Sequence, residues 1–241
     1  SSRSAYSSSS SVALNASTAH RVAPDWDYGF SELSAAHRAA ICRSRRVANP
    51  GCHATGFISS VYPLVQAGLI APDEFLTCFS LTGYSGGGKK MIAQYEGAEK
   101  SAAFASPRIY GLNQSHKHLP EMQQVCGLTT APAFSPIVDD YYKGMATTIA
   151  LPKAAESVQE ALAEHYKGAQ LVTVHPLGWD ESMVAANTNA GLDTLTLIVN
   201  GNAERCTVTA LFDNLGKGAS GAAVQNMNLM LGFEETAGLN L

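Results

Sequence analysis

The stretch VANPGCHATGF, residues 47–57, places a cysteine directly between a turn and the start of a predicted helix. Asn49, Pro50 and Gly51 end the strand that precedes them, and Cys52 follows at once. A buried structural cysteine needs no such setting, because it behaves as a small hydrophobe wherever the core has room. The thiolate, by contrast, is favoured by a helix N-terminus and by neighbouring cations. This position predicts a reactive Cys52 with an exposed sulfur and a lowered pKa, although free cysteines are mostly buried and inert.

The residues after Cys52 carry the apolar spacing of an amphipathic helix, at Phe57, Ile58, Val61, Leu64 and Val65. Pro63 must kink or interrupt this helix. Before the cysteine, residues 31–46 predict a helix capped near Ser31 or Ser34. Further helices are expected at residues 155–168 and 218–232, both ending at a glycine.

Strands are predicted by alternating or continuous apolar runs bounded by turn residues, at 12–17, 75–82, 109–118, 144–151, 169–177, 192–200 and 205–213. The strand at 75–82 runs into GYSGGGKK, a loop whose three glycines allow a close approach of the backbone to a ligand. Many strands with few helices between them indicate an α+β fold, a mixed and largely antiparallel sheet with helices packed on it.

Composition excludes several classes of function. The net charge is −4 with only 16 Lys and Arg residues, so no nucleic-acid-binding surface is expected. No apolar run reaches the length of a membrane span and no secretory signal is visible, so we expect a soluble, cytoplasmic protein. Five scattered cysteines without a C-x-x-C pair argue against a disulfide framework and against a zinc site.

The segment SHKHLPE, residues 115–121, carries two histidines and a carboxylate. In an extended segment His116 and His118 point to the same face, and Pro120 then ends the strand just before Glu121. Such a group can hold a general base and a partner that orients it. The alternative is that the histidines are ordinary surface or core residues. Zinc is disfavoured, because the other histidines supply no clear second ligand cluster.

Two further segments could bind anions. NASTAHR, residues 15–21, places hydroxyls and Arg21 directly after a predicted strand, where a guanidinium can hold a carboxylate or an oxyanion. DNLGKGASGAAVQNMN, residues 213–228, leads glycines and a lysine into a helix, whose free N–H groups can hold an anion or a cofactor amide. Each segment has a purely structural alternative, a capped turn in the first case and close helix packing in the second.

Taken together, NASTAHR, YGFSEL, RVANPGCHATGF, LTGYSGGGKKMI, HKHLPEM and the KGASG helix resemble, in this order, the N-acetyl-γ-glutamyl-phosphate reductase family, in particular its shorter bacterial type. The resemblance covers about residues 12–232. It implies a catalytic domain like that of glyceraldehyde-3-phosphate dehydrogenase and an NADPH-dependent reduction of an acyl phosphate to an aldehyde, a step of arginine biosynthesis.

The resemblance also implies roles for individual residues. Cys52 corresponds to the nucleophile and His116 is favoured as the base, with His118 and Glu121 in support. The residues expected near the substrate are Ser17, Arg21 and Asn49, and those expected near the cofactor are Ser85, Gly86, Gly87, Asn214, Gly218 and Ala219. No metal is expected.

The family likeness predicts three parts of the chain. Residues 1–48 are expected to be a Ser-rich tail with a remnant of a Rossmann-type dinucleotide-binding domain, most of which is expected to be absent. Residues 49–213 are expected to form the catalytic and dimerisation domain. Residues 214–241 are expected to form a C-terminal helix that returns to the cofactor domain.

Three alternatives remain open: a reductase like aspartate-semialdehyde dehydrogenase, a cysteine-dependent acyl hydrolase, and a non-catalytic oligomerisation fragment. A homodimer or homotetramer is expected, because the strand at 192–200 has more apolar residues than one wet face allows. This strand is therefore predicted to meet a second copy of the chain.

Overall fold

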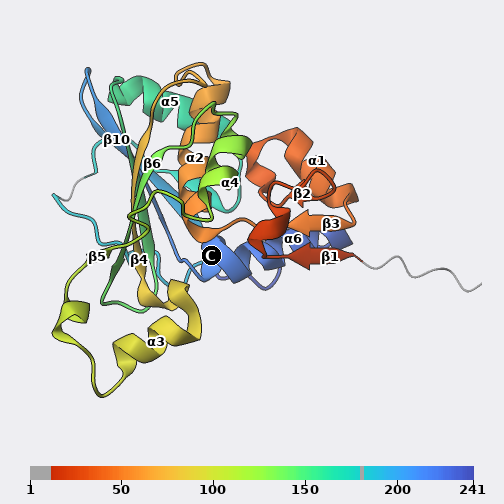
Figure 1. Cartoon of the computed structure of the whole chain (residues 1–241). Coiled ribbons are helices and arrows are strands. Elements are labelled where there is room, and N and C mark those ends of the chain that lie inside the picture. Colours follow the sequence, from red (N-terminus) through yellow and green to blue (C-terminus); the bar gives the residue numbers. More distant parts are fainter. Residues whose placement is uncertain (1–11, 180–181) are drawn as a thin grey trace, which may run out of the picture.

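The computed structural model describes residues 12–179 and 182–241, so the Ser-rich residues 1–11 lie outside the described part. The described residues form one large mixed sheet, with helices packed on one face, and a small parallel sheet beside it (Figure 1). The α+β architecture with a mixed, largely antiparallel sheet is confirmed.

The large sheet has the strand order β5-β6-β4-β7-β10-β9-β8. Its β4–β6 and β9–β8 pairs are parallel, and the other neighbouring pairs are antiparallel. Its strands are β4 (Thr77–Gly83), β5 (Arg108–Ile109), β6 (Ala133–Asp139), β7 (Met145–Leu151), β8 (Val172–Val174), β9 (Leu195–Gly201) and β10 (Cys206–Phe212). Sequence analysis missed β6, in which Pro136 obscures the strand pattern.

The helix α2 (Cys52–Gln66) packs across the large sheet with most of its residues buried. It continues through Pro63, which cannot donate a hydrogen bond to the Ser59 carbonyl four residues earlier. The Tyr166 hydroxyl replaces that donor and binds the Ser59 oxygen at 2.8 Å. The apolar spacing therefore predicted the helix correctly, and a tertiary contact compensates for the proline.

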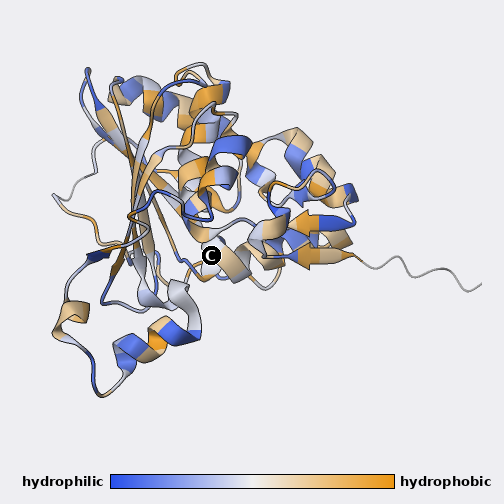
Figure 2. Cartoon of the chain, viewed as in Figure 1, coloured by the Kyte–Doolittle hydropathy of each residue, from blue (hydrophilic) through white to orange (hydrophobic). Residues whose placement is uncertain are grey.

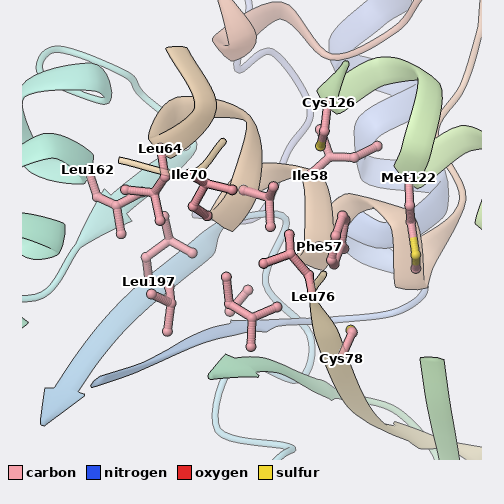
Figure 3. Packing of buried hydrophobic residues seen from close by; sticks show 14 of the residues in the cluster. Phe57, Ile58, Leu64, Ile70, Leu76, Cys78, Met122, Cys126, Leu162 and Leu197 are labelled. Carbon is pink, nitrogen blue, oxygen red and sulfur yellow. The ribbon is translucent and has the colours of Figure 1, made fainter. Parts of the chain in front are cut away.

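The main core lies between α2, the sheet and two further helices, α4 (Leu119–Cys126) and α5 (Ala155–His165) (Figure 3). Phe57 and Ile58 of α2, Met122 of α4 and Leu197 of β9 are all fully buried in it. Burying an apolar side chain of this size stabilises the fold by about 1.5–3 kcal/mol. This packing fixes the start of α2 against the central strands β7 and β10.

The small sheet has the order β1-β3-β2, with parallel pairing of β1 (Ala13–Asn15), β3 (Arg46–Ala48) and β2 (Asp27–Tyr28). Two helices lie against it, α1 (Ala35–Arg43) and α6 (Gly221–Leu231). Ile41, Val47 and Leu229 form its own small core. The C-terminal helix therefore packs with elements from the start of the described chain (Figure 1).

Capping residues end these helices as their chemistry predicts. The Ser34 side chain accepts a hydrogen bond from the His37 N–H at the start of α1. Gly232, with φ +73°, ends α6 in the left-handed region, where a side chain would be strained. The remaining short elements are η1 (Thr18–His20), η2 (Ser31–Leu33), η3 (Tyr84–Gly87), α3 (Gly88–Glu96), η4 (Ala102–Ala105) and the π-helix η5 (Gly216–Ser220).

The predicted strand at 109–118 is wrong beyond Ile109. Gly111 (φ +64°) and Gln114 (φ +53°) turn the backbone into the left-handed region. The Gln114 side-chain amide donates to the Phe134 carbonyl at 2.9 Å and accepts from the Phe134 N–H at 2.8 Å. A side chain thus takes the hydrogen bonds of β6 that a neighbouring strand would have used.

The inference that the apolar residues of β9 need a second copy of the chain to cover them is also wrong. Leu195, Leu197 and Val199 face the main core, and Ile198 points to the opposite face of the sheet. There Trp179, Val184 and other residues of the same chain pack over it. Both faces of β9 are covered within the chain, which explains its apolar character.

The helix α3 and the segment after it project from one end of the large sheet (Figure 1). This arm is rich in hydrophilic residues, whereas apolar residues concentrate in α2 and the strands behind it (Figure 2). No helix within the described ranges is long and apolar enough to cross a membrane.

Candidate active site

The site begins where β3 meets α2. Cys52 is the first residue of α2, with Gly51 as its N-cap, so the predicted helix entrance is present. The Asn49 side chain donates to the Ala219 carbonyl at 2.9 Å and accepts from Asn226 at 3.1 Å. The turn before the cysteine is therefore tied to the C-terminal segment of the chain.

Glu121 supports the same turn from behind. Its carboxylate accepts hydrogen bonds from the Gly51 N–H at 2.8 Å, the Tyr28 hydroxyl at 2.7 Å and Arg21 at 3.3 Å. Only 2% of this side chain is exposed, and 8% of Arg21 is. Burial raises the pKa of the Glu121 carboxyl, and Arg21 opposes that shift. Because all three partners are donors, they match an ionised carboxylate.

Three histidine rings cluster beside the turn. The ring centroids of His116 and His118 are 4.8 Å apart, and His53 lies 5.6 Å and 5.8 Å from them. The backbone N–H of His118 donates to the ring Nδ1 of His116 at 3.2 Å, so a neutral His116 carries its proton on Nε2. The histidines share a site although they do not lie on a strand as predicted, because His118 caps α4 instead.

Cys52 and the histidines line one cavity of about 360 Å³. The structure brings most of the predicted site residues to its wall, namely Arg21, Asn49, Cys52, Ser85, Gly86, Gly87, His116, His118, Asn214, Gly218 and Ala219. Two predicted residues lie elsewhere. Glu121 lies behind the wall, and the Ser17 hydroxyl accepts a hydrogen bond from the Ala19 N–H and caps η1.

Burial changes the acid–base properties of the site. It raises the pKa of the Cys52 thiol, against the opposing effects of the His53 N–H and the Arg21 charge. This direction is opposite to the predicted lowering of the thiol pKa, because desolvation by burial is the largest effect on Cys52. Burial lowers the pKa of both His116 and His118, and the Lys117 charge adds to this effect. Neutral imidazoles therefore face a protonated thiol near pH 7.

The histidine cluster does not resemble a metal centre. In the described part of the chain, no group of three or more His, Cys, Asp or Glu side chains is arranged to hold a metal ion. Both ring nitrogens of His53 are already in use, with Ser80 at 2.7 Å and Tyr110 at 2.6 Å. Burial lowers the pKa of His53 to about 3, so this ring is a neutral structural link.

The side of the cavity opposite the histidines is built from small residues and amides. The Asn214 side chain donates to the Ser85 hydroxyl at 2.9 Å and accepts from the Gly144 N–H at 2.9 Å, which joins the glycine loop to η5. A Cβ added at Gly218 would lie 3.1 Å from the Cys52 Cβ. Glycine at this position therefore lets the η5 backbone pack closely against the start of α2.

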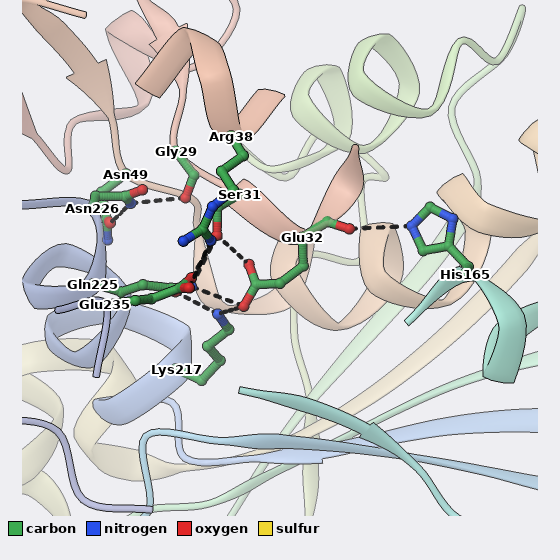
Figure 4. Close-up of polar contacts among 10 residues, drawn as sticks. All are labelled: Gly29, Ser31, Glu32, Arg38, Asn49, His165, Lys217, Gln225, Asn226 and Glu235. Carbon is green, nitrogen blue, oxygen red and sulfur yellow. Dashed lines mark hydrogen bonds and ion pairs between the residues drawn. The ribbon is translucent and has the colours of Figure 1, made fainter. Parts of the chain in front are cut away.

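A buried polar network holds η5 in place (Figure 4). The Lys217 ammonium is 2% exposed and pairs with Glu32 at 2.5 Å. It also donates to the side-chain amide oxygen of Gln225 at 2.6 Å. Gln225 also donates to Glu235, whose carboxylate accepts from Arg38 at 2.6 Å. Lys217 lowers the pKa of the Glu32 carboxyl against the effect of burial. The network fixes the backbone of Gly218 and Ala219 next to Cys52.

Three titratable residues of the cavity wall were not among the predicted site residues, namely His53, Tyr110 and Lys117. His53 follows Cys52 directly, and that adjacency was an available signal. Lys117 stands between the two predicted histidines and was also visible. Tyr110 gave no signal, because a tyrosine within a predicted strand is ordinary strand material.

Known proteins resemble this chain in sequence over most of its length. Residues 52–214 match the family model described as "Semialdehyde dehydrogenase, dimerisation domain". The N-acetyl-gamma-glutamyl-phosphate reductase of Sinorhizobium fredii is 46% identical over 228 residues, which cover 90% of this chain and 74% of the relative. Reductase 2 of the same name from Pseudomonas putida is 43% identical over 240 residues, covering 93% and 75%.

Solved structures confirm the fold. Aspartate semialdehyde dehydrogenase II from Vibrio cholerae superposes with a TM-score of 0.70 at 18% identity, covering 91% of this chain and 72% of that one. The Candida albicans aspartate semialdehyde dehydrogenase with NADP gives a TM-score of 0.62 at 12% identity, covering 91% and 70%. The sequence identity to these relatives shows that the chain belongs to the N-acetyl-γ-glutamyl-phosphate reductase family.

Proposed function

We propose that this chain carries the catalytic cysteine of an NADPH-dependent reductase that converts N-acetyl-γ-glutamyl phosphate to N-acetylglutamate 5-semialdehyde and phosphate. The observation that carries the proposal is the meeting of Cys52, His116 and His118 at one cavity wall, in a chain 43–46% identical to reductases of this name. The reaction is a step of arginine biosynthesis.

The first step is attack of the Cys52 sulfur on the acyl carbon. The carbon–oxygen bond to the phosphoryl group breaks and a thioester remains, which divides one difficult reaction into two easier steps. Because the thiol pKa is raised, the thiol proton must be removed during the attack. A neutral histidine that lines the same cavity suits that role, and general base catalysis contributes about 10²–10⁴-fold.

The two histidines differ in the hydrogen bonds they make. His116 accepts a bond at Nδ1, so its Nε2–H is a donor that can protonate an oxygen of the reacting acyl group. The Nδ1 of His118 is buried and has no hydrogen-bond partner among the described residues, so it is not accessible to a ligand. His116 is therefore the ring proposed to exchange a proton with the substrate.

The cavity wall opposite the histidines fits a nicotinamide ring. Gly218 lets the backbone of η5 lie close to Cys52, and Asn214 and Ser85 present amide and hydroxyl groups to the same cavity. NADPH, when bound, supplies the hydride that reduces the thioester. The aspartate semialdehyde dehydrogenase of Candida albicans, which has a similar fold, is described with NADP, and this supports the choice of cofactor. Ser85, Asn214 and the Gly218–Ala219 backbone are the residues proposed to hold it.

The chain is further proposed to form a homodimer through the outer face of the large sheet. Leu81 and Ile137 lie opposite each other in the β4–β6 register, and Ile109 pairs with Ile137 from the other side. Phe79 of the same face is 49% exposed and Ile109 is 57% exposed. These four residues form a contiguous apolar patch that no helix of the described chain covers. The dimerisation-domain family match supports a second copy as its partner.

A single-turnover experiment tests the reaction. We expect that adding N-acetyl-γ-glutamyl phosphate releases about one phosphate per chain, leaves an acyl mass on Cys52, and supports NADPH oxidation to the semialdehyde. The Cys52→Ser variant should show neither the acyl mass nor NADPH oxidation. β-Aspartyl phosphate serves as the comparison substrate. Phosphate release that continues with hydrolysis of the acyl group and without NADPH oxidation would contradict the reductase and identify a hydrolase.

A further inference from the structure

Two cationic side chains line the cavity in the part of the chain that the structure describes, Arg21 and Lys117. Arg21 is largely committed to holding the fold. Its Nε donates to the Asn49 carbonyl at 2.9 Å, one Nη donates to the Ala16 carbonyl at 2.7 Å, and the other pairs with Glu121. The Glu121 carboxylate neutralises its charge, so Arg21 presents little net charge to a ligand.

Lys117 is in the opposite situation. It is exposed at the cavity wall and forms no ion pair with any residue of the described chain. His116 and His118 flank it in sequence and line the same cavity. Cys52 lines this cavity too, and the Lys117 charge lowers the pKa of Cys52, His116 and His118. The cavity that contains the nucleophile therefore also contains one positive charge that no described residue pairs with.

The reaction needs a positive charge at this place. When the Cys52 sulfur bonds to the acyl carbon, the carbon–oxygen bond breaks and the oxygen leaves with the electron pair on the phosphoryl group. The negative charge on the phosphoryl group increases from about 2 to 3 as it leaves, unless it gains a proton. Transfer of the thiol proton to it gives HPO₄²⁻. Donors positioned where charge develops are usually the largest single contribution to rate.

We propose that the Lys117 ammonium binds the phosphoryl group of the acyl phosphate and stabilises it as it leaves. This assignment rests on the proposed function and adds to it the residue that selects a phosphorylated substrate. Lysine suits the role because its compact ammonium is a point charge that can follow the departing group. Arg21 then acts as a positioning residue for the turn that carries Cys52.

Protection of Cys52 from alkylation by inorganic phosphate tests the proposal without acyl-phosphate turnover or cofactor. The parent protein carries Cys42→Ser, because Cys42 is exposed and would compete for iodoacetamide. Alkylation of Cys52 is followed by peptide mass spectrometry across a phosphate titration at constant ionic strength. Lys117→Met removes the charge, Lys117→Arg keeps it, and Lys90→Met removes an exposed charge from α3 that does not line the cavity.

We expect phosphate to protect the parent, Lys117→Arg and Lys90→Met at similar concentrations. Lys117→Met should need about tenfold to a hundredfold more phosphate, the range expected for losing a charged hydrogen bond. The proposal is overturned if phosphate does not protect the parent, if Lys117→Met is protected like the parent, or if Lys90→Met loses protection equally.

Steady-state kinetics in the oxidative direction supply a second readout. Lys117→Met should raise the KM for phosphate by a similar factor and leave the KM for the semialdehyde unchanged, which a general structural defect would not do. Equal increases in both KM values would overturn the proposal. If no turnover is seen in any variant, the reductase function fails while the alkylation result still decides the role of Lys117.

Discussion

The Gly51 N–H donates to the Glu121 carboxylate at 2.8 Å, so a side chain 70 residues further along the chain fixes the backbone next to Cys52. We expect Glu121→Ala to lose about 3–5 kcal/mol of stability, because Arg21 is left as a buried unpaired cation. In the folded fraction kcat should fall by about 10²-fold, as for a small misplacement of a catalytic group.

Urea unfolding and initial rates measure the two effects of Glu121→Ala separately. Glu121→Gln is the matched control, because it keeps an acceptor for Gly51 and removes only the charge. It should retain more activity than Glu121→Ala. Wild-type stability in Glu121→Ala would show that the carboxylate does not hold the turn.

The raised pKa of the Cys52 thiol predicts the pH dependence of its alkylation. The thiolate is the reactive form, so the rate should rise about tenfold per pH unit from pH 7 to pH 9 without reaching a plateau. Iodoacetamide labelling followed at the Cys52 peptide measures it, with the exposed Cys42 as an internal comparison. A plateau already below pH 7 would show that the helix N-terminus outweighs burial.

Burial of neutral His53 predicts a loss of stability in acid. Its pKa is about 3 in the folded protein against about 6.5 for an ordinary histidine, so the unfolded state binds more protons below pH 6.5. The free energy of unfolding should fall by about 1.4 kcal/mol per pH unit between pH 6.5 and pH 3 from this residue.

Urea unfolding at pH 7 and at pH 5 measures the contribution of His53. His53→Gln should be less stable than the wild type at pH 7, because the link between Ser80 and Tyr110 is disturbed. It should nevertheless lose about 2 kcal/mol less between the two pH values. Parallel curves for the two proteins would mean that His53 is not buried as a neutral ring.

The ion pair of Lys217 and Glu32 predicts a strongly coupled pair of substitutions. Lys217→Met leaves Glu32 buried without its partner and should cost about 3–5 kcal/mol, whereas Lys217→Met with Glu32→Gln should recover much of that loss. Lys167→Met removes a lysine whose pair with Glu164 is exposed, and should change stability by less than about 1 kcal/mol. Additive effects of the two buried substitutions in a double-mutant cycle would contradict the pairing.

The exposed apolar patch predicts the effect of Phe79→Asp on assembly. A charge at the centre of a homodimer interface should shift the particle toward the 25.4 kDa mass of one chain. Light scattering at micromolar concentration measures the mass. Phe233→Asp, at an exposed phenylalanine of the C-terminal segment, is the control and should leave the mass unchanged. A monomeric wild-type protein would rule out the interface.

Local sequence signals were sufficient wherever neighbouring residues decide the structure. The NPG turn and the apolar spacing after it predicted that Cys52 begins a helix, and Ser34 and Gly232 marked helix ends correctly. Alternating apolar residues predicted β7, β9 and β10 to within a few residues. Hydrogen bonding and side-chain periodicity act over a few residues, so the sequence alone reveals them.

Only the tertiary structure decided the properties that depend on distant groups. Residues 110–118 form turns because the Gln114 side chain occupies the hydrogen bonds of Phe134. The thiol pKa of Cys52 is raised because walls from other parts of the chain desolvate it, an effect that no local pattern reports. Glu121, predicted to take part in the chemistry, instead holds Arg21 and Gly51, because a buried charge requires partners and the fold supplies them from separate segments.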